Sequence, residues 1–150
     1  GIAIIRVGGA TEIEMIEKKY RIEDALEAVN SAQQEGIVPG GGSVLIHVAK
    51  NLQVEVDNED QELGVLITKE AIFAPIKQMA SNAGQSPDIV VDKVNTCESQ
   101  LEGWDFTKGE IVNMIEAGIV DPVKVTRCAL QNAVSVASTL ITTSHAIVEI

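Results

Sequence analysis

The stretch that decides the fold of this chain, residues 22–43, reads IEDALEAVNSAQQEGIVPGGGS. Its first part is typical of a charged amphipathic helix. Gly36 ends that helix, because glycine adopts the left-handed cap without steric cost. Gly40, Gly41 and Gly42 then open the next predicted helix. These three glycines either form a flexible connector or leave room for a backbone or a ligand to approach closely.

One acidic residue, Asp24, lies in the middle of the predicted helix and off its apolar stripe. The stripe is formed by Met15, Ile22, Leu26 and Val29. Aspartate is a weak helix former away from the N-terminus. The simplest interpretation from the residues alone is a solvated carboxylate, helped by Arg21 one turn earlier.

The composition favours one helical domain. The 150 residues are 45% hydrophobic but only 3% aromatic, so the core must be built from Ile, Val, Leu and Ala. The net charge of −11 makes non-specific nucleic-acid binding an unlikely class of function, since such binding depends on Lys and Arg at the phosphates. An anionic small ligand would need backbone amides or a metal ion to offset the repulsion.

The cysteines, the histidines and the longest apolar run argue against a disulfide-rich, a metal-binding and a membrane-spanning protein. Cys97 and Cys128 have neither a zinc spacing nor a disulfide framework, so we expect a reducing, cytoplasmic compartment. His47 and His145 have no ligand-like neighbours. The apolar run at residues 128–141 is interrupted by polar residues, which predicts a buried helix of a soluble protein and no membrane span.

The pattern along the chain predicts a mainly α fold with a short β-strand near each chain end. The strands are expected at residues 2–7 and 146–150. The helices are expected at residues 11–36, 43–52, 59–83 with a break at Pro75, 87–96, 111–117 and 122–141. Residues 101–109 are turn-rich and form the least regular part. An apolar strand that starts at Gly1, with no initiator methionine, suggests a piece of something longer.

Three motifs make the chain resemble a known family. They are ATEIEMIEKKYRIEDAL at residues 10–26, EGIVPGGG at 35–42 and GIVDPVKVTR at 118–127. In sequence, order and spacing they resemble the group I chaperonins, the bacterial GroEL type, and the resemblance extends over essentially all 150 residues. It implies that residues 1–36 are the returning segment of the intermediate domain. Residues 37–150 are then the C-terminal half of a multihelical equatorial ATPase domain.

The resemblance also implies roles for individual residues. Asp24 matches the catalytic carboxylate of the family, which swings over the nucleotide and positions the attacking water. Gly40 and Gly41 match the turn whose backbone packs against the nucleotide. Asp121 matches the acid that hydrogen-bonds the ribose, and from its place before a proline it can also cap the helix that follows.

The adenine-binding region departs from the family pattern. Where the family has Asn followed by two small residues, this chain has Asp105, Phe106 and Thr107. A carboxylate accepts hydrogen bonds but cannot donate them as an amide does. Phe106 either adds a stacking surface or fills part of the pocket. Trp104 is expected to be a core residue beside that pocket.

The resemblance implies ATP and Mg²⁺ as cofactors, with the phosphate loop and the main magnesium ligand in the family's first half. We therefore expect no metal ligand in this chain, and no ATPase activity from these 150 residues alone. In the full family the subunits form two stacked seven-membered rings that fold other proteins. The co-chaperonin and unfolded polypeptides bind an apical domain that is not in this sequence.

Two other hypotheses stay open at the level of sequence. The chain could be a helical scaffold or interaction module that keeps the fold without turnover. An upstream glycine-rich phosphate loop would favour the chaperonin ATPase instead. An independent P-loop enzyme is disfavoured, because the residues after Gly40 lack the Gly-Lys-Ser/Thr ending that a P-loop needs.

Overall fold

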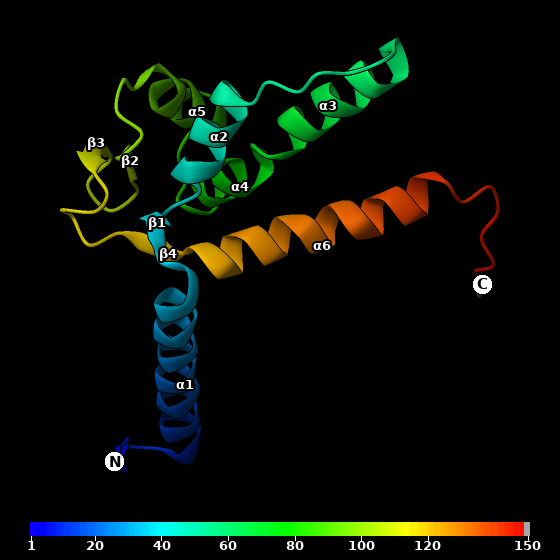
Figure 1. The fold of residues 1–150 in the computed structure, drawn as a ribbon. Coiled ribbons are helices and arrows are strands. Elements are labelled where there is room, and N and C mark those ends of the chain that lie inside the picture. Colours follow the sequence, from blue (N-terminus) through cyan, green and yellow to red (C-terminus); the bar gives the residue numbers. More distant parts are fainter. Residues whose placement is uncertain (149–150) are drawn as a thin grey trace. The chain divides into compact units, whose positions relative to one another are not determined.

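The computed structural model of the chain describes residues 1–148 and is mainly helical, as the sequence predicts (Figure 1). The elements in chain order are α1 (Glu12–Glu35), β1 (Ile37–Pro39), α2 (Ser43–Asn51), α3 (Glu59–Ala71), α4 (Ala74–Asn82), α5 (Pro87–Thr96), β2 (Glu102–Asp105), β3 (Glu110–Asn113), β4 (Val120–Pro122) and α6 (Val123–Ile141).

These elements belong to two compact units. The first consists of residues 1–36 together with the described residues from 122 onward, and the second consists of residues 37–121. The predicted boundary between residues 36 and 37 coincides with a boundary between units. The assignment of residues 1–36 and 37–150 to intermediate and equatorial domains stays a prediction.

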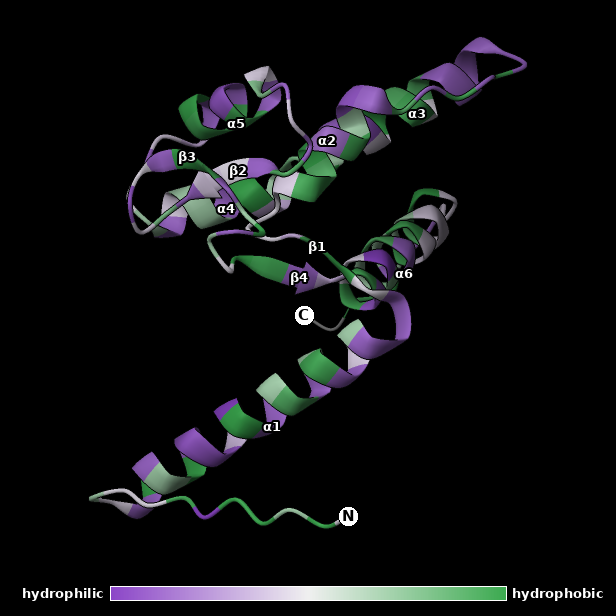
Figure 2. Ribbon diagram, turned by 60° about the vertical axis from the view of Figure 1, so that its left-hand side comes forward, coloured by the Kyte–Doolittle hydropathy of each residue, from purple (hydrophilic) through white to green (hydrophobic). Residues whose placement is uncertain are grey.

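In the first unit, local signals set both ends of α1. The Thr11 Oγ1 accepts a hydrogen bond from the Glu14 amide at 3.2 Å, and the Glu14 carboxylate accepts one from the Ala10 amide at 2.8 Å. At the other end Gly36 takes φ +86° and its amide donates to the Ala32 carbonyl at 2.8 Å. Figure 2 shows polar and apolar residues alternating along this helix. These bonds cap the helix that the sequence predicts from residue 11, and the predicted stop at Gly36 is confirmed.

The C-terminal end of α1 is joined to the start of α6. The Arg127 guanidinium donates to both carboxylate oxygens of Glu35, at 2.6 Å and 2.9 Å. The Val123 amide donates to the Gly36 carbonyl at 3.1 Å. This bidentate ion pair holds the pKa of the Glu35 carboxyl below its ordinary value, chiefly through the hydrogen bonds from Arg127.

We expect the Glu35–Arg127 ion pair to make the stability of this unit depend on pH. Because the pKa of Glu35 is lower in the folded than in the unfolded state, the stabilisation is present above the unfolded pKa. It is lost as the pH falls through the folded pKa. Glu35→Gln should therefore flatten the acid limb of a plot of thermal midpoint against pH, below about pH 4.5, measured by far-UV circular dichroism.

A matched control for this prediction is Glu27→Gln, which makes the same chemical change at an exposed site on α1. The control should keep the acid limb of the wild-type chain. An acid limb of Glu35→Gln that coincides with that of the wild-type chain would contradict the prediction.

The second half of α6 is exposed, which corrects the expectation of a buried helix at residues 128–141. No residue of α6 is buried, and residues 131–141 are all exposed. The apolar side chains left exposed on this half are Val134, Val136, Leu140 and Ile141. Among residues 1–148 no helix has both the length and the apolar character needed to cross a membrane.

In the second unit, α2, α4, α5 and the strand β2 surround one hydrophobic core (Figure 1). Its buried members are Ile46, Ile76, Ala80, Val90, Val94 and Trp104. The predicted break at Pro75 is confirmed: α3 ends at Ala71, and the proline occupies the first turn of α4, where its missing amide donor is tolerated.

The strands β2 and β3 form an antiparallel hairpin in which Glu102 pairs with Asn113 and Asp105 pairs with Glu110. The helix predicted at residues 111–117 is therefore wrong. Residues 101–109 are turn-rich as predicted at 101 and 106–109, but residues 102–105 form the strand β2. Ile111 and Val112 are β-branched and find backbone partners across the hairpin, which outweighs the weak helical spacing of this short segment.

The strands predicted near the chain ends are also wrong within the described residues. Residues 2–7 form no strand, and neither do residues 146–148. Residues 149–150 of the second predicted strand lie outside the described residues. A strand requires a paired backbone, and no segment of the described chain pairs with either stretch. The strands that do form, β1 with β4 and β2 with β3, lie in the interior of the sequence.

Candidate functional site

The glycine turn at residues 40–42 is packed tightly and is not a flexible connector. The Gly40 amide donates to the Ile119 carbonyl at 3.0 Å, and a Cβ at Gly40 would lie 3.1 Å from that same oxygen. Gly42 has φ +75°, and a Cβ there would lie 2.9 Å from the Met79 Cε. Side chains are therefore excluded from the turn by the backbone before β4 and by the core.

Gly41 packs closely against the β2–β3 hairpin. It takes φ +63°, and a Cβ at this position would lie 3.3 Å from the Met114 Cε. The same Cβ would lie 3.7 Å from the Trp104 carbonyl oxygen and 4.0 Å from the Phe106 Cε2. The structure thus brings Gly41 and Phe106 together, although 64 positions separate them in the sequence.

The Asp105 carboxylate is engaged by its own turn. Asp105 is only 6% exposed, and its Oδ1 accepts hydrogen bonds from the Thr107 amide at 2.8 Å and the Lys108 amide at 3.2 Å. The Asp105 carbonyl accepts a further bond from the Gly109 amide at 2.7 Å. This side chain therefore shapes the hairpin turn that presents Phe106 and Thr107.

Asp121 lies on β4, directly after the segment that packs on Gly40. The expectation that it caps α6 is wrong, since Pro122 takes the N-cap position and makes no side-chain cap bond. Burial raises the pKa of the Asp121 carboxyl above its ordinary value. Among residues 1–148 no side chain pairs with this half-buried carboxylate, so it is available to accept a hydrogen bond from a ligand hydroxyl.

Asp24 is exposed in the middle of α1 and belongs to the first unit. The other candidate residues all lie in the second unit. Within the described residues no ion pair joins Arg21 to Asp24, so the helper proposed from the sequence is not observed. The structure brings Gly40, Gly41, Phe106 and Asp121 into one unit and leaves the relation of Asp24 to them undetermined.

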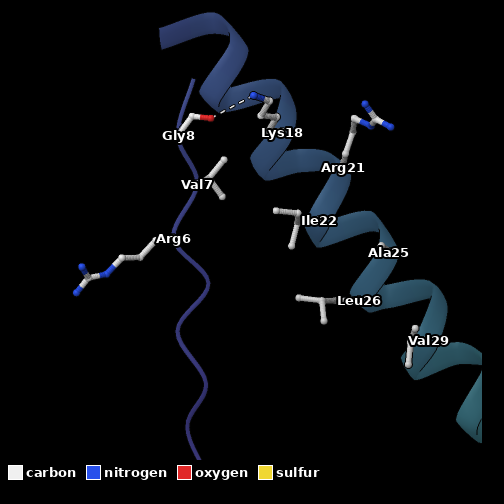
Figure 3. A pocket seen from close by; sticks show the side chains of 9 residues that line it. All are labelled: Arg6, Val7, Gly8, Lys18, Arg21, Ile22, Ala25, Leu26 and Val29. Atoms are coloured by element: carbon white, nitrogen blue, oxygen red, sulfur yellow. Dashed lines mark hydrogen bonds between the residues drawn. The ribbon is translucent and has the colours of Figure 1, made fainter. Parts of the chain in front are cut away.

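A groove runs along the other side of α1, between the helix and the segment that precedes it (Figure 3). Its lining residues are Arg6, Val7, Gly8, Lys18, Arg21, Ile22, Ala25, Leu26 and Val29. The Lys18 Nζ donates to the Gly8 carbonyl at 3.2 Å and closes one end. Three residues of the predicted apolar stripe, Ile22, Leu26 and Val29, line this groove, and none of the candidate site residues does.

One residue beside the site was not predicted from the sequence. Gln85 follows α4, and its side-chain amide contacts both Trp104 and Phe106. Trp104 is buried, as expected, and the Lys93 Nζ lies 4.5 Å from the centroid of its ring. The local sequence around Gln85 indicates only a helix end, so these contacts could not be foreseen.

The fold resembles that of a known class of protein. It matches a crystal structure of a group III chaperonin in the open state with a TM-score of 0.78 and 30% sequence identity. The match covers 94% of this chain and 30% of the other chain, so this chain spans less than a third of that protein. The expected chaperonin fold is confirmed.

The family is established by sequence over the whole chain. A model of the TCP-1/cpn60 chaperonin family matches residues 1–150. The chain belongs to this family.

Proposed function

We propose that this chain is the C-terminal part of an ATP-dependent chaperonin subunit and forms the base and ribose end of its ATP site. One observation carries the proposal. The half-buried Asp121 carboxylate has no side-chain partner in the described part of the chain, and it directly follows the backbone that packs on the glycine turn. A carboxylate that is partly desolvated and has no partner costs free energy, which is expected at a binding site.

The residues present fit the base and ribose of a nucleotide. Gly41 has no side chain, and a Cβ there would occupy part of the space beside Phe106. A purine is flat and apolar on its faces, so it would pack on the partly exposed Phe106 ring, next to the bare Gly41 backbone. Asp121 would accept a hydrogen bond from a ribose hydroxyl, as the resemblance to group I chaperonins implies.

The proposal assigns the phosphate end of the site to the first half of the family's chain. No group of three or more His, Cys, Asp or Glu side chains that could hold a metal ion occurs in residues 1–148. The phosphates and Mg²⁺ would be held by groups outside this chain. Bound MgATP supplies the terminal phosphoryl group for hydrolysis. Asp24 would contribute a carboxylate that accepts a proton from water and orients it.

The activity of the whole protein follows from this assignment as part of the proposal. Full-length subunits would assemble into a double seven-membered ring and fold polypeptides with a co-chaperonin, in the cytoplasm. The motifs favour the group I type within the family. These 150 residues alone would not turn over ATP, because the phosphate loop is missing.

The test is a titration of this chain with MgATP, followed by the fluorescence of its only tryptophan, Trp104. We expect a saturable change in Trp104 fluorescence. The dissociation constant for MgATP should be in the millimolar range, because the phosphate contacts are absent. Asp121→Ala should raise the dissociation constant about tenfold or more, because a hydrogen bond to a charged group contributes about 1.5–3 kcal/mol.

Asp92→Ala serves as the matched control, since it removes an exposed carboxylate on α5 in the same unit. It should bind MgATP like the unmodified chain. The proposal is wrong if MgATP leaves the Trp104 emission unchanged. It is equally wrong if Asp121→Ala and Asp92→Ala give the same titration curve.

The helical scaffold without turnover is the second candidate function. The engagement of the Asp105 carboxylate in its own turn favours it, because one of the residues expected at the adenine has a structural task instead. A flat MgATP titration by a well-folded chain would be the result that this second candidate predicts.

A further inference from the structure

We propose that Gln85 is a positioning residue for the base end of the nucleotide site. Its side-chain amide holds the Trp104 indole and the Phe106 main chain at the same time, and so fixes the wall that faces Gly41. The nucleotide part of this inference rests on the proposed function. The holding of the hairpin turn does not, and it can be measured without any ligand.

The Gln85 amide makes two hydrogen bonds with opposite roles. Its Oε1 accepts from the Trp104 Nε1 at 2.6 Å, and its Nε2 donates to the Phe106 carbonyl oxygen at 3.3 Å. An indole N–H can only donate and a carbonyl can only accept, so a single orientation of the amide satisfies both. The two bonds therefore fix the relative position of the Trp104 ring and the main chain two residues later.

Gln85 is itself anchored to the core. Its backbone amide donates to the Ala80 carbonyl at 2.9 Å, and Ala80 is fully buried. Gly84, which precedes it with φ +69°, follows Ala83, the C-cap residue of α4. The position of Gln85 is thus set by α4, independently of the hairpin that it holds.

The position of Trp104, on the hairpin side of the contact, is also restricted. The Lys93 ammonium lies over the Trp104 ring at 4.5 Å, so α5 holds one part of the indole while Gln85 holds its N–H. The main chain of the same residue turns toward the glycine turn: the Trp104 carbonyl oxygen lies 3.7 Å from where a Gly41 Cβ would be. A shift at Gln85 would therefore move the residues that border Gly41.

Hydrogen bonds within the protein also limit which groups of the hairpin turn can contact a nucleotide base. The Phe106 carbonyl oxygen is engaged by Gln85, and the Asp105 Oδ1 is engaged by the turn amides. These two acceptors are therefore used within the protein. The ring of Phe106 remains as the group that packs against the face of a base, and its position depends on the main chain that Gln85 holds.

The experiment compares Gln85→Leu with Gln85→Glu. The leucine loses both hydrogen bonds. The glutamate keeps an acceptor for the Trp104 N–H but replaces the donor to Phe106 with a carboxylate oxygen, which repels the Phe106 carbonyl oxygen. Three quantities are measured on the 150-residue chain: the Trp104 emission maximum, hydrogen exchange of the Thr107 and Gly109 amides, and the dissociation constant for MgATP.

We expect faster amide exchange at Thr107 and Gly109 in both variants, by about tenfold or more, because one hydrogen bond that holds the turn is lost. The emission maximum should shift in Gln85→Leu and stay near the wild-type value in Gln85→Glu. Both variants should bind MgATP about tenfold more weakly. If Gln85 had only a structural role, both variants would lower the unfolding midpoint, but the Trp104 emission maximum would not distinguish Gln85→Leu from Gln85→Glu.

Gln78→Leu is the matched control, because Gln78 lies exposed on α4 and bonds only the Asn82 side chain within the described residues. It should leave all three quantities unchanged. Wild-type exchange at Thr107 and Gly109 in Gln85→Leu would overturn the proposal. So would unchanged MgATP affinity in a variant whose exchange is faster.

A failure of the proposed function gives a different experimental result from a failure of the inference about Gln85. If the wild-type chain does not bind MgATP, the proposed function and the nucleotide part of this inference are both contradicted. The exchange and emission data would then still decide, on their own, whether Gln85 holds the turn.

Discussion

Replacing Gly103 with alanine is expected to destabilise the second unit by about 3 kcal/mol or more, at the upper end of the range for overpacked cores. A Cβ at Gly103 would lie 2.2 Å from the Ser43 Oγ, 2.7 Å from the Ser43 Cβ and 2.8 Å from the Met114 Cγ. Ser43 and Met114 are both fully buried, so neither can swing into solvent. Urea unfolding followed by Trp104 emission measures the loss directly, because Trp104 is the next residue.

The control for this prediction is Gly64→Ala in α3, where a Cβ would meet nothing within 4 Å. It should raise stability by about 0.5–1 kcal/mol through helix propensity. Equal urea midpoints for the two variants would contradict the prediction.

A second substitution sharpens the test of Gly103→Ala. Ser43→Gly removes both Ser43 atoms from the clash, and the Ser43 Oγ has no hydrogen-bond partner among the described residues, so no bond is lost with it. The double variant should recover part of the stability. The recovery should be incomplete, because the Met114 Cγ still lies 2.8 Å from the new Cβ.

The other large effect is expected for Ile76→Ala. Ile76 is fully buried in the core of the second unit, and its Cβ would lie 3.1 Å from a Cβ at Gly42. Truncation leaves a cavity that the neighbouring helices cannot fill, so we expect a loss of about 2–5 kcal/mol in the free energy of unfolding. Alanine keeps the Ile76 Cα and Cβ that lie beside Gly42, so the effect on the glycine turn should be smaller than the effect on the core.

Ile89→Ala makes the same truncation on α5 at a side chain that is 57% exposed. It should change the free energy of unfolding by less than about 1 kcal/mol. Guanidinium unfolding of the two variants at one temperature gives the comparison. A loss of similar size for both would show that Ile76 is not at the centre of the core.

The helices were predictable because the signals that start and stop them are local. Thr11 and Glu14 lie within one turn of the end that they cap, Gly36 supplies the left-handed cap, and Pro75 removes an amide from its own helix. Such signals act over three or four residues, and the sequence alone contains them. The class of fold and the family motifs were recognisable for the same reason.

The strands were not predictable to the same degree, because a strand exists only where another segment pairs with it. Residues 2–7 have strand-like composition but no partner in the described chain, whereas Glu110–Asn113 pairs with Glu102–Asp105. The helical burial expected at residues 128–141 failed in the same way, since burial depends on what packs against the helix. Both properties are set by segments distant in the sequence.

Part of the candidate site was likewise predictable from the sequence, and part is visible only in the tertiary structure. Sequence motifs alone singled out Asp24, Gly40, Gly41 and Asp121, because the resemblance lies in contiguous residues. Only the tertiary structure shows that the Asp105 carboxylate is engaged by its own turn and that Gln85 holds Trp104 and Phe106. Those hydrogen bonds depend on the distance and direction between atoms. Packing of the core around Trp104 sets both, and no local pattern encodes them.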